Sequence, residues 1–374
     1  MADPKLRADV HSICDDSGKL HFTRLSTLGG FGRIEERIAK AFNALEQLIS
    51  KLSSEHVVVV DCSHFHHLRQ SREKTLNLFT TENNRPVIVL HNCDSDFLNG
   101  YDKLASGHRE RFRLRPELET DLQRLTHQIN SNSDYMVVPR GALRPSESQV
   151  QDALFLEDRY LCQVVKESAR SLNTEDSNKR LRSTPLTSSH FFDASRILGN
   201  HCDYIWFVSR LAVDMKSLVS LVRSRHGDQD LKEVPRILAC TRNGATLASA
   251  IQSFLSHLWF DSLRIDVVDR FAPTQRMVEE YDGGDGQNLE GQRWYVYVGD
   301  FTIAGTEIKI AEAHSHYRGI PILGGLVIGS VLPILAAADT AQGQNSTLAS
   351  QFSVFPLVKL SELTLESPLK YQFP

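Results

Sequence analysis

No two of the six cysteines have the CxxC spacing of a zinc or redox site. They are scattered along the 374 residues, which favours reduced thiols in a cytoplasmic protein over a disulfide framework. The amino-terminal stretch lacks the apolar segment of a secretory signal, which also agrees with a cytoplasmic location. The formal net charge is only −4, so we expect no general attraction to nucleic acid or to an anionic membrane.

One uncharged run is long enough to span a bilayer. Residues 319–338 read GIPILGGLVIGSVLPILAAA, and about 20 apolar residues suffice for a membrane helix. Two prolines and four glycines interrupt the run, and both residue types disfavour the interior of a helix. We therefore predict a buried strand followed by a loop, and no contact with a membrane.

Strands alternate with helical patterns in the amino-terminal half. Apolar residues recur at helical spacing over residues 33–52, while residues 56–61 (HVVVVD) and 86–90 (PVIVL) are typical of buried strands. The order of these elements over residues 33–104 resembles a STAS-type module, in pattern rather than in motif. That resemblance implies a domain that binds partners or reports nucleotide or phosphorylation state, with Ser63 near its switch position.

A group of histidines follows the first of these strands. His64, His66 and His67 lie close to Cys62, but this spacing on a loop does not make the side chains converge on a metal ion. Packed or solvent-facing histidines are the favoured interpretation, so we assign no metal site.

Two helices and a polar stretch complete this half. Residues 109–130 predict a charged, exposed helix, and residues 147–172 a long helix with one apolar face. Residues 173–184 (NTEDSNKRLRST) are the most polar stretch and mark a boundary. We therefore expect two α/β domains, a small STAS-like one over residues 1–140 and a second one over residues 184–374, joined by a helical connector over residues 141–183.

The second domain is organised around residues 294–311, WYVYVGDFTIAGTEIKIA. A β-branched and aromatic run predicts a buried strand, and a small-residue loop leads into a helix. Free backbone N–H groups and the positive end of the helix dipole favour an anion there, and Gly305 lets the backbone approach a phosphate. Asp300 lies at the carboxyl end of the strand, where ligands of open α/β sheets bind. An ordinary strand–helix turn that carries an aspartate is the alternative.

Three further segments precede this one. Residues 188–194 (SSHFFDA) lead into a helical pattern over residues 203–222, and residues 236–250 (RILACTRNGATLASA) predict a buried strand, a turn and a helix. A hydrophilic, glycine-rich loop covers residues 271–291, and such long loops are usually functional or disordered. Two more buried strands are predicted, over residues 322–328 and 353–360.

With the four segments in this order, residues 184–363 resemble the type I phosphoribosyltransferases, and most of all the orotate phosphoribosyltransferases. The motif of that family is a buried strand, two acids and then V-I-T-A-G-T-A-I-R. The sequence VYVGDFTIAGTEIK places Ala304, Gly305 and Thr306 at matching positions. The resemblance implies a Rossmann-like parallel sheet, Mg²⁺ as cofactor, phosphoribosyl diphosphate or a nucleotide as ligand, and a homodimer.

The resemblance also implies roles for particular residues. Those expected to bind phosphate and ribose are Asp300, Phe301, Thr302, Ala304, Gly305 and Thr306. The pyrophosphate loop would be formed by Thr241, Arg242, Asn243 and Gly244. The base would lie against Phe191 and Phe192. The catalytic residues would be Asp300 and Arg276.

The chain departs from the family pattern in four places. Gly299 replaces the first of the two acids, which leaves Asp300 alone to hold the ribose hydroxyls. Ile303 replaces a threonine of the phosphate loop. The loop that contains Arg276 carries acidic residues that would repel pyrophosphate. The arginine that holds the orotate carboxylate aligns with the apolar Val331, and because an unpaired buried carboxylate is costly, orotate is disfavoured as a substrate.

Three functions are therefore compared. The first is an enzyme that transfers phosphoribose to or from a base other than orotate. The second is a catalytically degenerate nucleotide-binding sensor that acts through its STAS-like domain on a partner protein, an arrangement that would suit a bacterial regulatory or defence system. A protein with interactions but no ligand would leave the Gly/Thr loop unexplained. The retained parts of the motif favour the first function, and whether the chain is an enzyme stays open.

Overall fold

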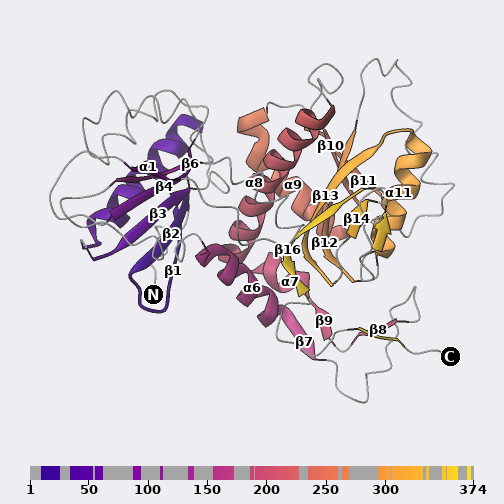
Figure 1. The fold of residues 1–374 in the computed structure, drawn as a ribbon, viewed down its shortest axis with the longest axis horizontal. Coiled ribbons are helices and arrows are strands. Elements are labelled where there is room, and N and C mark those ends of the chain that lie inside the picture. The colour runs from indigo at the N-terminus through magenta and orange to yellow at the C-terminus, as the bar shows by residue number, and fades with distance from the viewer. Residues whose placement is uncertain are drawn as a thin grey trace. The chain divides into compact units, whose positions relative to one another are not determined.

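A computed structural model describes residues 10–25, 34–53, 55–61, 87–93, 110–112, 134–138, 155–171, 186–188, 190–226, 235–259, 263–268, 294–303, 305–331, 334–336, 348–350, 352–360 and 369–371. The chain divides into two compact units, Met1–Tyr160 and Leu161–Pro374 (Figure 1). The division falls within helix α6 (Leu156–Ser168), inside the segment expected to be a connector. The domain limits given above stay a prediction.

A mixed sheet forms the centre of the first unit, in the order β1-β2-β3-β4-β6-β5. Its strands are β1 (Val10–Cys14), β2 (Leu20–Leu25), β3 (Val57–Asp61), β4 (Val87–Cys93), β5 (Glu110–Phe112) and β6 (Asp134–Val138). Strands β2, β3 and β4 are parallel, and the outer pairings are antiparallel. The predicted buried strands thus correspond to β3 and β4. Nothing in this topology tests the STAS-like resemblance.

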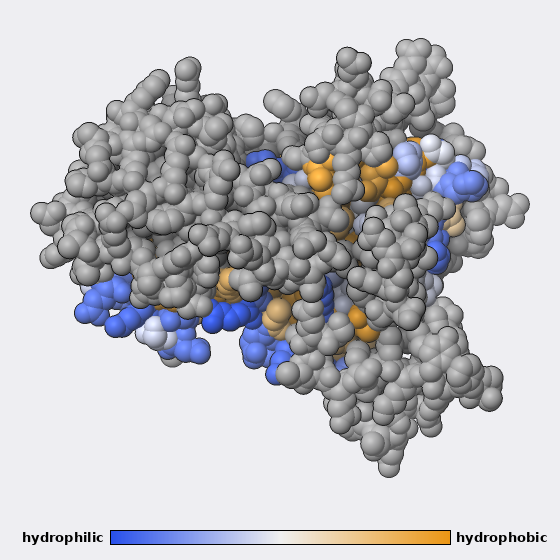
Figure 2. All heavy atoms as spheres, viewed as in Figure 1, coloured by the Kyte–Doolittle hydropathy of each residue, from blue (hydrophilic) through white to orange (hydrophobic). Residues whose placement is uncertain are grey.

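The hairpin between β1 and β2 is closed by local polar contacts. The Asp15 carboxylate accepts a hydrogen bond from the Leu20 N–H at 2.9 Å, and Gly18 adopts a positive φ of 69°. An aspartate that binds a later backbone N–H and a glycine in the left-handed region are both typical of tight turns. Figure 2 shows hydrophilic side chains over this hairpin, at the lower left of the view.

Helix α1 (Ile34–Ser50) confirms the amphipathic helix predicted after residue 33. Leu45 and Ile49, four residues apart, are both fully buried, as residues on one face of a helix should be. Three of the four valines of β3 have no exposed surface. The core of this unit therefore follows the two periodicities of the sequence.

Two helix predictions need correction. The helix expected over residues 109–130 is wrong at its start, because residues 110–112 form β5, the edge strand of the sheet. Charged side chains such as Glu110 and Arg111 are tolerated on an edge strand, so their polarity did not indicate a helix. The helix expected over residues 147–172 ends at Ser168, and β7 (Ala169–Ser171) follows because it pairs with β9 (His190–Phe192).

The second unit contains a seven-stranded sheet in the order β11-β10-β12-β13-β16-β14-β15. Its strands are β10 (Arg236–Ala239), β11 (Ile265–Val267), β12 (Tyr295–Thr302), β13 (Ile322–Ser330), β14 (Ile334–Ala336), β15 (Leu348–Ser350) and β16 (Val354–Lys359). The first five in the sheet are parallel. This confirms the α/β class predicted for the carboxyl-terminal half. A small separate sheet pairs β8 (Leu186–Ser188) with β17 (Leu369–Tyr371).

Helices cover both faces of this parallel sheet (Figure 1). Helices α8 (His201–His226) and α9 (Arg242–Trp259) lie on one face, and α11 (Thr306–Arg318) lies on the other. The short α7 (Ala194–Gly199) precedes α8. Strand β10 connects through α9 to β11, whereas β12 connects through α11 to β13 in the opposite direction along the sheet. Because strand–helix–strand connections are right-handed, the two directions place the two helices on opposite faces.

The uncharged run contains the predicted buried strand, but the part predicted as a loop includes a second strand, β14, at residues 334–336. Residues 322–330 form β13, which lies between β12 and β16 and is buried on both faces. Within the part of the chain that the structure describes, no helix is both long enough and apolar enough to cross a membrane.

Candidate functional site

The connections out of β10 and β12 run in opposite directions, so the sheet has a topological switch point between these two neighbouring strands. Ligands of open α/β sheets bind outside the carboxyl ends of the strands at such a point. The segment that follows β10 begins α9 at Arg242, and the segment that follows β12 begins α11 at Thr306. Two helix starts therefore meet the ends of the two strands.

A hydrogen bond joins the two sides of this switch point. Asn243 Nδ2, in the first turn of α9, donates to Asp300 Oδ2 at the end of β12, at 2.8 Å. Both side chains are half-buried. This hydrogen bond uses only Oδ2 of the Asp300 carboxylate. An ionised carboxylate has about four lone-pair sites, so Oδ1 can accept further hydrogen bonds. The structure thus brings together two residues that the sequence assigned to separate functional segments.

The start of α9 is held close to β12. The Thr241 hydroxyl accepts a hydrogen bond from the Gly244 N–H at 2.9 Å, as the capping residue of a helix does. A Cβ atom at Gly244 would lie 2.9 Å from the Val298 carbonyl oxygen, closer than a side chain can lie without displacing the backbone. Gly244 therefore permits the approach of helix and strand, while Arg242 is exposed at the helix start.

Helix α11 begins directly after a glycine. Gly305 has a φ of 72°, in the left-handed region, and caps the helix without a side-chain hydrogen bond. The orphan N–H groups of a first turn carry partial positive charge and are suited to an anion. Thr306 is half-buried at this start.

Thr302 and Phe301 lie at the end of β12. Thr302 is 4 % exposed, and its hydroxyl has no hydrogen-bond partner among the described residues. Its backbone carbonyl accepts from the Val331 N–H at 3.1 Å. Val331 is itself buried.

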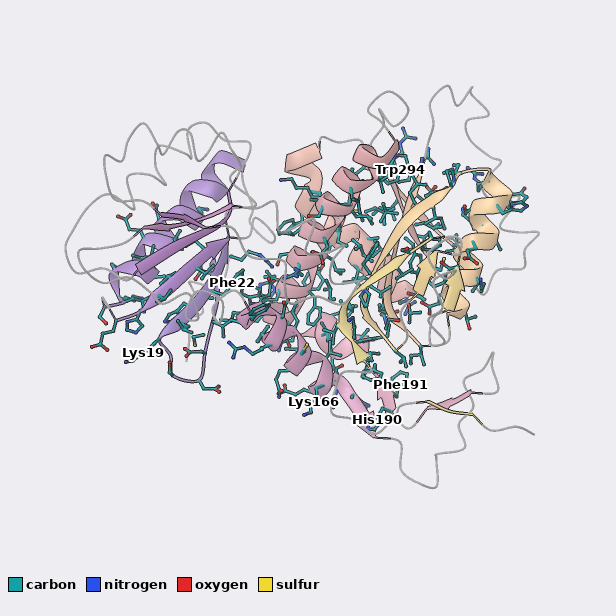
Figure 3. The ribbon with its side chains drawn as sticks, viewed as in Figure 1. Lys19, Phe22, Lys166, His190, Phe191 and Trp294 are labelled. Carbon is teal, nitrogen blue, oxygen red and sulfur yellow. The ribbon has the colours of Figure 1, made fainter. Side chains whose placement is uncertain are left out.

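The two phenylalanines expected at the base point in different directions, because neighbouring residues of a strand face opposite sides. Phe192 is buried, and its ring lies 5.4 Å from that of Phe301, centroid to centroid. Phe191, the middle residue of β9, is 54 % exposed (Figure 3). The structure therefore brings Phe192, and not Phe191, against the segment that carries Asp300.

Tyr297 occupies the space beside Gly299. A Cβ atom at Gly299 would lie 2.5 Å from the Tyr297 hydroxyl oxygen and 3.0 Å from Cζ. The Tyr297 side chain has no exposed surface, so it cannot swing into solvent. The position where the family resemblance predicts an acid is thus closed by a neighbouring aromatic side chain.

The Tyr297 hydroxyl also contacts the first turn of α11. It donates to Glu307 Oε2 over 3.4 Å, a long hydrogen bond. Burial raises the pKa of the Tyr297 phenol well above its ordinary value, and the negative charge of Glu307 adds to this effect. The phenol is therefore protonated at neutral pH and acts as a donor. The pKa of the nearby Cys240 thiol is raised to about 12, chiefly by burial and further by Glu307.

Two residues of this site were missed by sequence reasoning, Tyr297 and Glu307. Glu307 could have been found in the sequence, because this acid stands where the phosphoribosyltransferase motif has an alanine. No pattern in the sequence signals that the Tyr297 ring lies against Gly299. Arg276, Ala304 and the histidines that follow β3 lie outside the described residues. Among the described residues, no group of three or more histidine, cysteine, aspartate or glutamate side chains could hold a metal ion.

Comparison with known proteins gives two kinds of result. No protein-family model and no curated protein matches the chain. The solved structures that resemble it include phosphoribosyltransferases.

Three of these structures illustrate the similarity. The orotate phosphoribosyltransferase of Aeropyrum pernix is 17% identical, over 54% of this chain and 95% of that one, with a TM-score of 0.30. A phosphoribosyltransferase of Corynebacterium diphtheriae is 16% identical, over 56% and 99%, with a TM-score of 0.28. The UMP synthase of Leishmania donovani is 14% identical, over 87% and 81%, with a TM-score of 0.32.

Proposed function

We propose that the switch-point site binds phosphoribosyl diphosphate or a nucleotide, and that the protein transfers phosphoribose to or from a base other than orotate. The observation that carries this proposal is the hydrogen bond from Asn243 to Asp300. It joins the expected pyrophosphate loop to the expected ribose-binding carboxylate at the place where the fold presents a ligand.

In this proposal each segment binds one part of the ligand. Asp300 accepts hydrogen bonds from the ribose hydroxyls, and the first turn of α11, from Gly305 and Thr306, binds the 5′-phosphate. The start of α9, from Thr241 to Gly244, lies on the pyrophosphate side. Displacement at the sugar C1 passes through an oxocarbenium-like state, so positioning and charge stabilisation account for most of the catalysis.

Magnesium fits this arrangement as a partner of the ligand. Mg²⁺ in nucleotide sites is commonly held by one or two carboxylates together with substrate phosphates, not by a cage of protein ligands. Asp300 supplies such a carboxylate, and the described residues contain no cage. The metal would offset the charge of the diphosphate, while Asn243 and Asp300 orient the sugar.

The second candidate is a sensor that binds the same ligand without transferring phosphoribose. It is favoured by one specific observation: the space of the first acid is closed by Tyr297. In that case the amino-terminal unit, which resembles a STAS-type module, interacts with a protein partner according to whether the ligand is bound. In both candidate functions we propose that the protein forms a homodimer.

Calorimetric titration with phosphoribosyl diphosphate and Mg²⁺, beside a pyrophosphate-release assay over a panel of bases, tests both candidates. We expect wild-type binding and at least a tenfold loss in Asp300→Asn, because hydrogen bonds to a charged group contribute about 1.5–3 kcal/mol. The control is Asp16→Asn, an exposed aspartate in the first unit. Binding without release of pyrophosphate would select the sensor. Equal, negligible heats for wild type and Asp300→Asn would refute both.

A further inference from the structure

The last residues of β12 divide between the two faces of the sheet. Neighbouring residues of a strand point to opposite faces, so Tyr297 and residue 299 share one face while Asp300 lies on the other. The contacts agree with this division, because Tyr297 donates to Glu307 of α11 whereas Asp300 accepts from Asn243 of α9. The two helices cover opposite faces (Figure 1). A side chain at residue 299 would therefore point away from Asp300, and the side chain that contacts Asp300 comes from α9.

Each side chain of the Asn243–Asp300 pair has one oxygen left over. The hydrogen bond joins Nδ2 to Oδ2 at 2.8 Å, and among the described residues neither Oδ1 atom has a hydrogen-bond partner. Because Nδ2 donates to the carboxylate, the orientation of the amide is fixed and its Oδ1 is an acceptor. Both residues are half-buried. The pair thus offers two adjoining acceptors, one on a charged group and one on a neutral group.

A buried hydroxyl on the same face also lacks a partner. Thr302 lies two residues after Asp300 in β12 and therefore faces the same side of the sheet. It is 4 % exposed, and its hydroxyl forms no hydrogen bond within the part of the chain that the structure describes. An unpaired buried polar group is costly, and a bound ligand would supply the missing hydrogen bond. This observation is independent of the Asn243–Asp300 contact and points to the same end of β12.

We propose that Asn243 is the second sugar-binding residue of the switch-point site. Its Oδ1 accepts from one hydroxyl of a vicinal diol, and Asp300 Oδ1 accepts from the neighbouring hydroxyl. This inference rests on the proposed function, because the diol is that of the phosphoribose. A vicinal diol has two donors on adjoining carbon atoms, which matches two acceptors on side chains joined at 2.8 Å. The ligand class is a phosphorylated sugar in which both hydroxyls are free.

An amide suits this position because of the charge of its neighbour. A second carboxylate in contact with Asp300 would repel it, and would also repel the phosphate of the ligand. Asn243 avoids this repulsion, since its NH₂ group donates to Asp300 and its oxygen remains an acceptor. Two sugar hydroxyls are therefore bound with a single negative charge.

Calorimetric titration of the full chain with ribose 5-phosphate and its 2-deoxy and 3-deoxy analogues, at pH 8 without divalent cations, tests this assignment. The wild type should bind each deoxy sugar about threefold to tenfold more weakly than ribose 5-phosphate, because each lacks one hydrogen bond. Asn243→Ala should bind one deoxy sugar as well as it binds ribose 5-phosphate, and should still discriminate against the other. Asp300→Ala should lose discrimination against that other sugar instead.

Asn243→Asp separates the contact with the sugar from the contact with Asp300. It keeps Oδ1 as an acceptor, but it has no N–H group to donate and places a second charge beside Asp300. We therefore expect weaker binding of all three sugars, with discrimination against both deoxy sugars retained. The control is Thr246→Ala on the next turn of α9, where the exposed hydroxyl donates to the Arg242 carbonyl. This variant should bind like the wild type.

The results that overturn the inference differ from those that overturn the proposed function. If Asn243→Ala and Asp300→Ala lose discrimination against the same deoxy sugar, Asn243 only positions Asp300 and the inference is wrong. It is also wrong if Asn243→Ala discriminates like the wild type, or if Asn243→Asp loses discrimination as Asn243→Ala does. The proposed function survives these results, because the protein still binds the phosphorylated sugar. If the wild type binds neither ribose 5-phosphate nor phosphoribosyl diphosphate, the proposed function fails and the inference fails with it.

Discussion

Restoring a side chain at Gly299 should destabilise the second unit, and Tyr297 should be the reason. In Gly299→Ala, the new Cβ would lie 2.5, 3.0 and 3.1 Å from the hydroxyl oxygen, Cζ and Cε1 of Tyr297. Ordinary van der Waals contacts of a Cβ atom begin near 3.4 Å. The ring has no exposed surface and lies 6.1 Å from that of Phe352, centroid to centroid, so relief requires the core to shift.

Two effects of opposite sign set the magnitude. Overpacking a well-packed core costs about 1–3 kcal/mol. Replacing glycine by alanine reduces the entropy of the unfolded chain and returns about 0.4–1 kcal/mol. We therefore expect a net loss of about 1–2 kcal/mol in the free energy of unfolding. For a unit of this size that is a decrease of about 2–8 °C in Tm.

The measurement is urea unfolding followed by tryptophan fluorescence. All three tryptophans, at positions 206, 259 and 294, belong to the second unit, so the signal reports that unit. The control is Gly199→Ala, since a Cβ atom there would meet nothing within 4 Å. Adding Tyr297→Phe removes the closest atom, and the loss caused by Gly299→Ala should then shrink by about 1 kcal/mol. A Gly299→Ala protein as stable as the wild type, or a loss that Tyr297→Phe leaves unchanged, would refute the reasoning.

Three further predictions concern stability and reactivity. Arg24→Met should lower the free energy of unfolding of the first unit by about 3–5 kcal/mol, because it leaves the buried Glu157 charge without its bidentate partner. Urea unfolding followed by circular dichroism measures this loss. The double variant Arg24→Met/Glu157→Leu should recover most of it. Burial, the largest cause, lowers the pKa of His21 below its ordinary value of 6.5. The unfolded state therefore binds the proton more readily, and the free energy of unfolding falls as the pH decreases below about 6.5. His21→Gln should flatten this part of the plot of stability against pH, and an unchanged slope would contradict the assignment. The Cys240 thiol is buried, and its pKa is raised to about 12. It should therefore resist alkylation at pH 8 until denaturant is added, whereas the exposed Cys202 should be labelled at once. Peptide mass spectrometry measures both reactions.

Local periodicity predicted most of the elements. The five residues 294–298 (WYVYV) predicted a strand buried on both faces, and β12 has this burial because its two neighbours and the helices on both faces exclude water. The apolar spacing over residues 33–52 predicted α1 in the same way. Strand β13 was recognised within the run over residues 319–338 because the glycines and prolines of the run are incompatible with a long helix, whereas the short strand β14 was predicted as loop. The edge strand β5 was missed because a charged edge strand has no apolar alternation to detect.

The residue types of the candidate site were also evident in the sequence, but their pairing was not. Asp300 after a buried strand and Asn243 in a turn were both named as candidates, and only the order of β10 and β12 in the sheet brings them to 2.8 Å. The opposite directions of Phe191 and Phe192 likewise follow from the placement of β9, which buries one ring against Phe301.

The sequence by itself determined that residue 299 is a glycine, where the family resemblance predicts an acid, and that residue 307 is a glutamate. The tertiary structure decided that the two facts are related, because the Tyr297 hydroxyl closes the first position and contacts the second. Such a relation has no sequence period. It depends on how α11 packs across the end of β12, and packing between elements is determined by the whole core rather than by neighbouring residues.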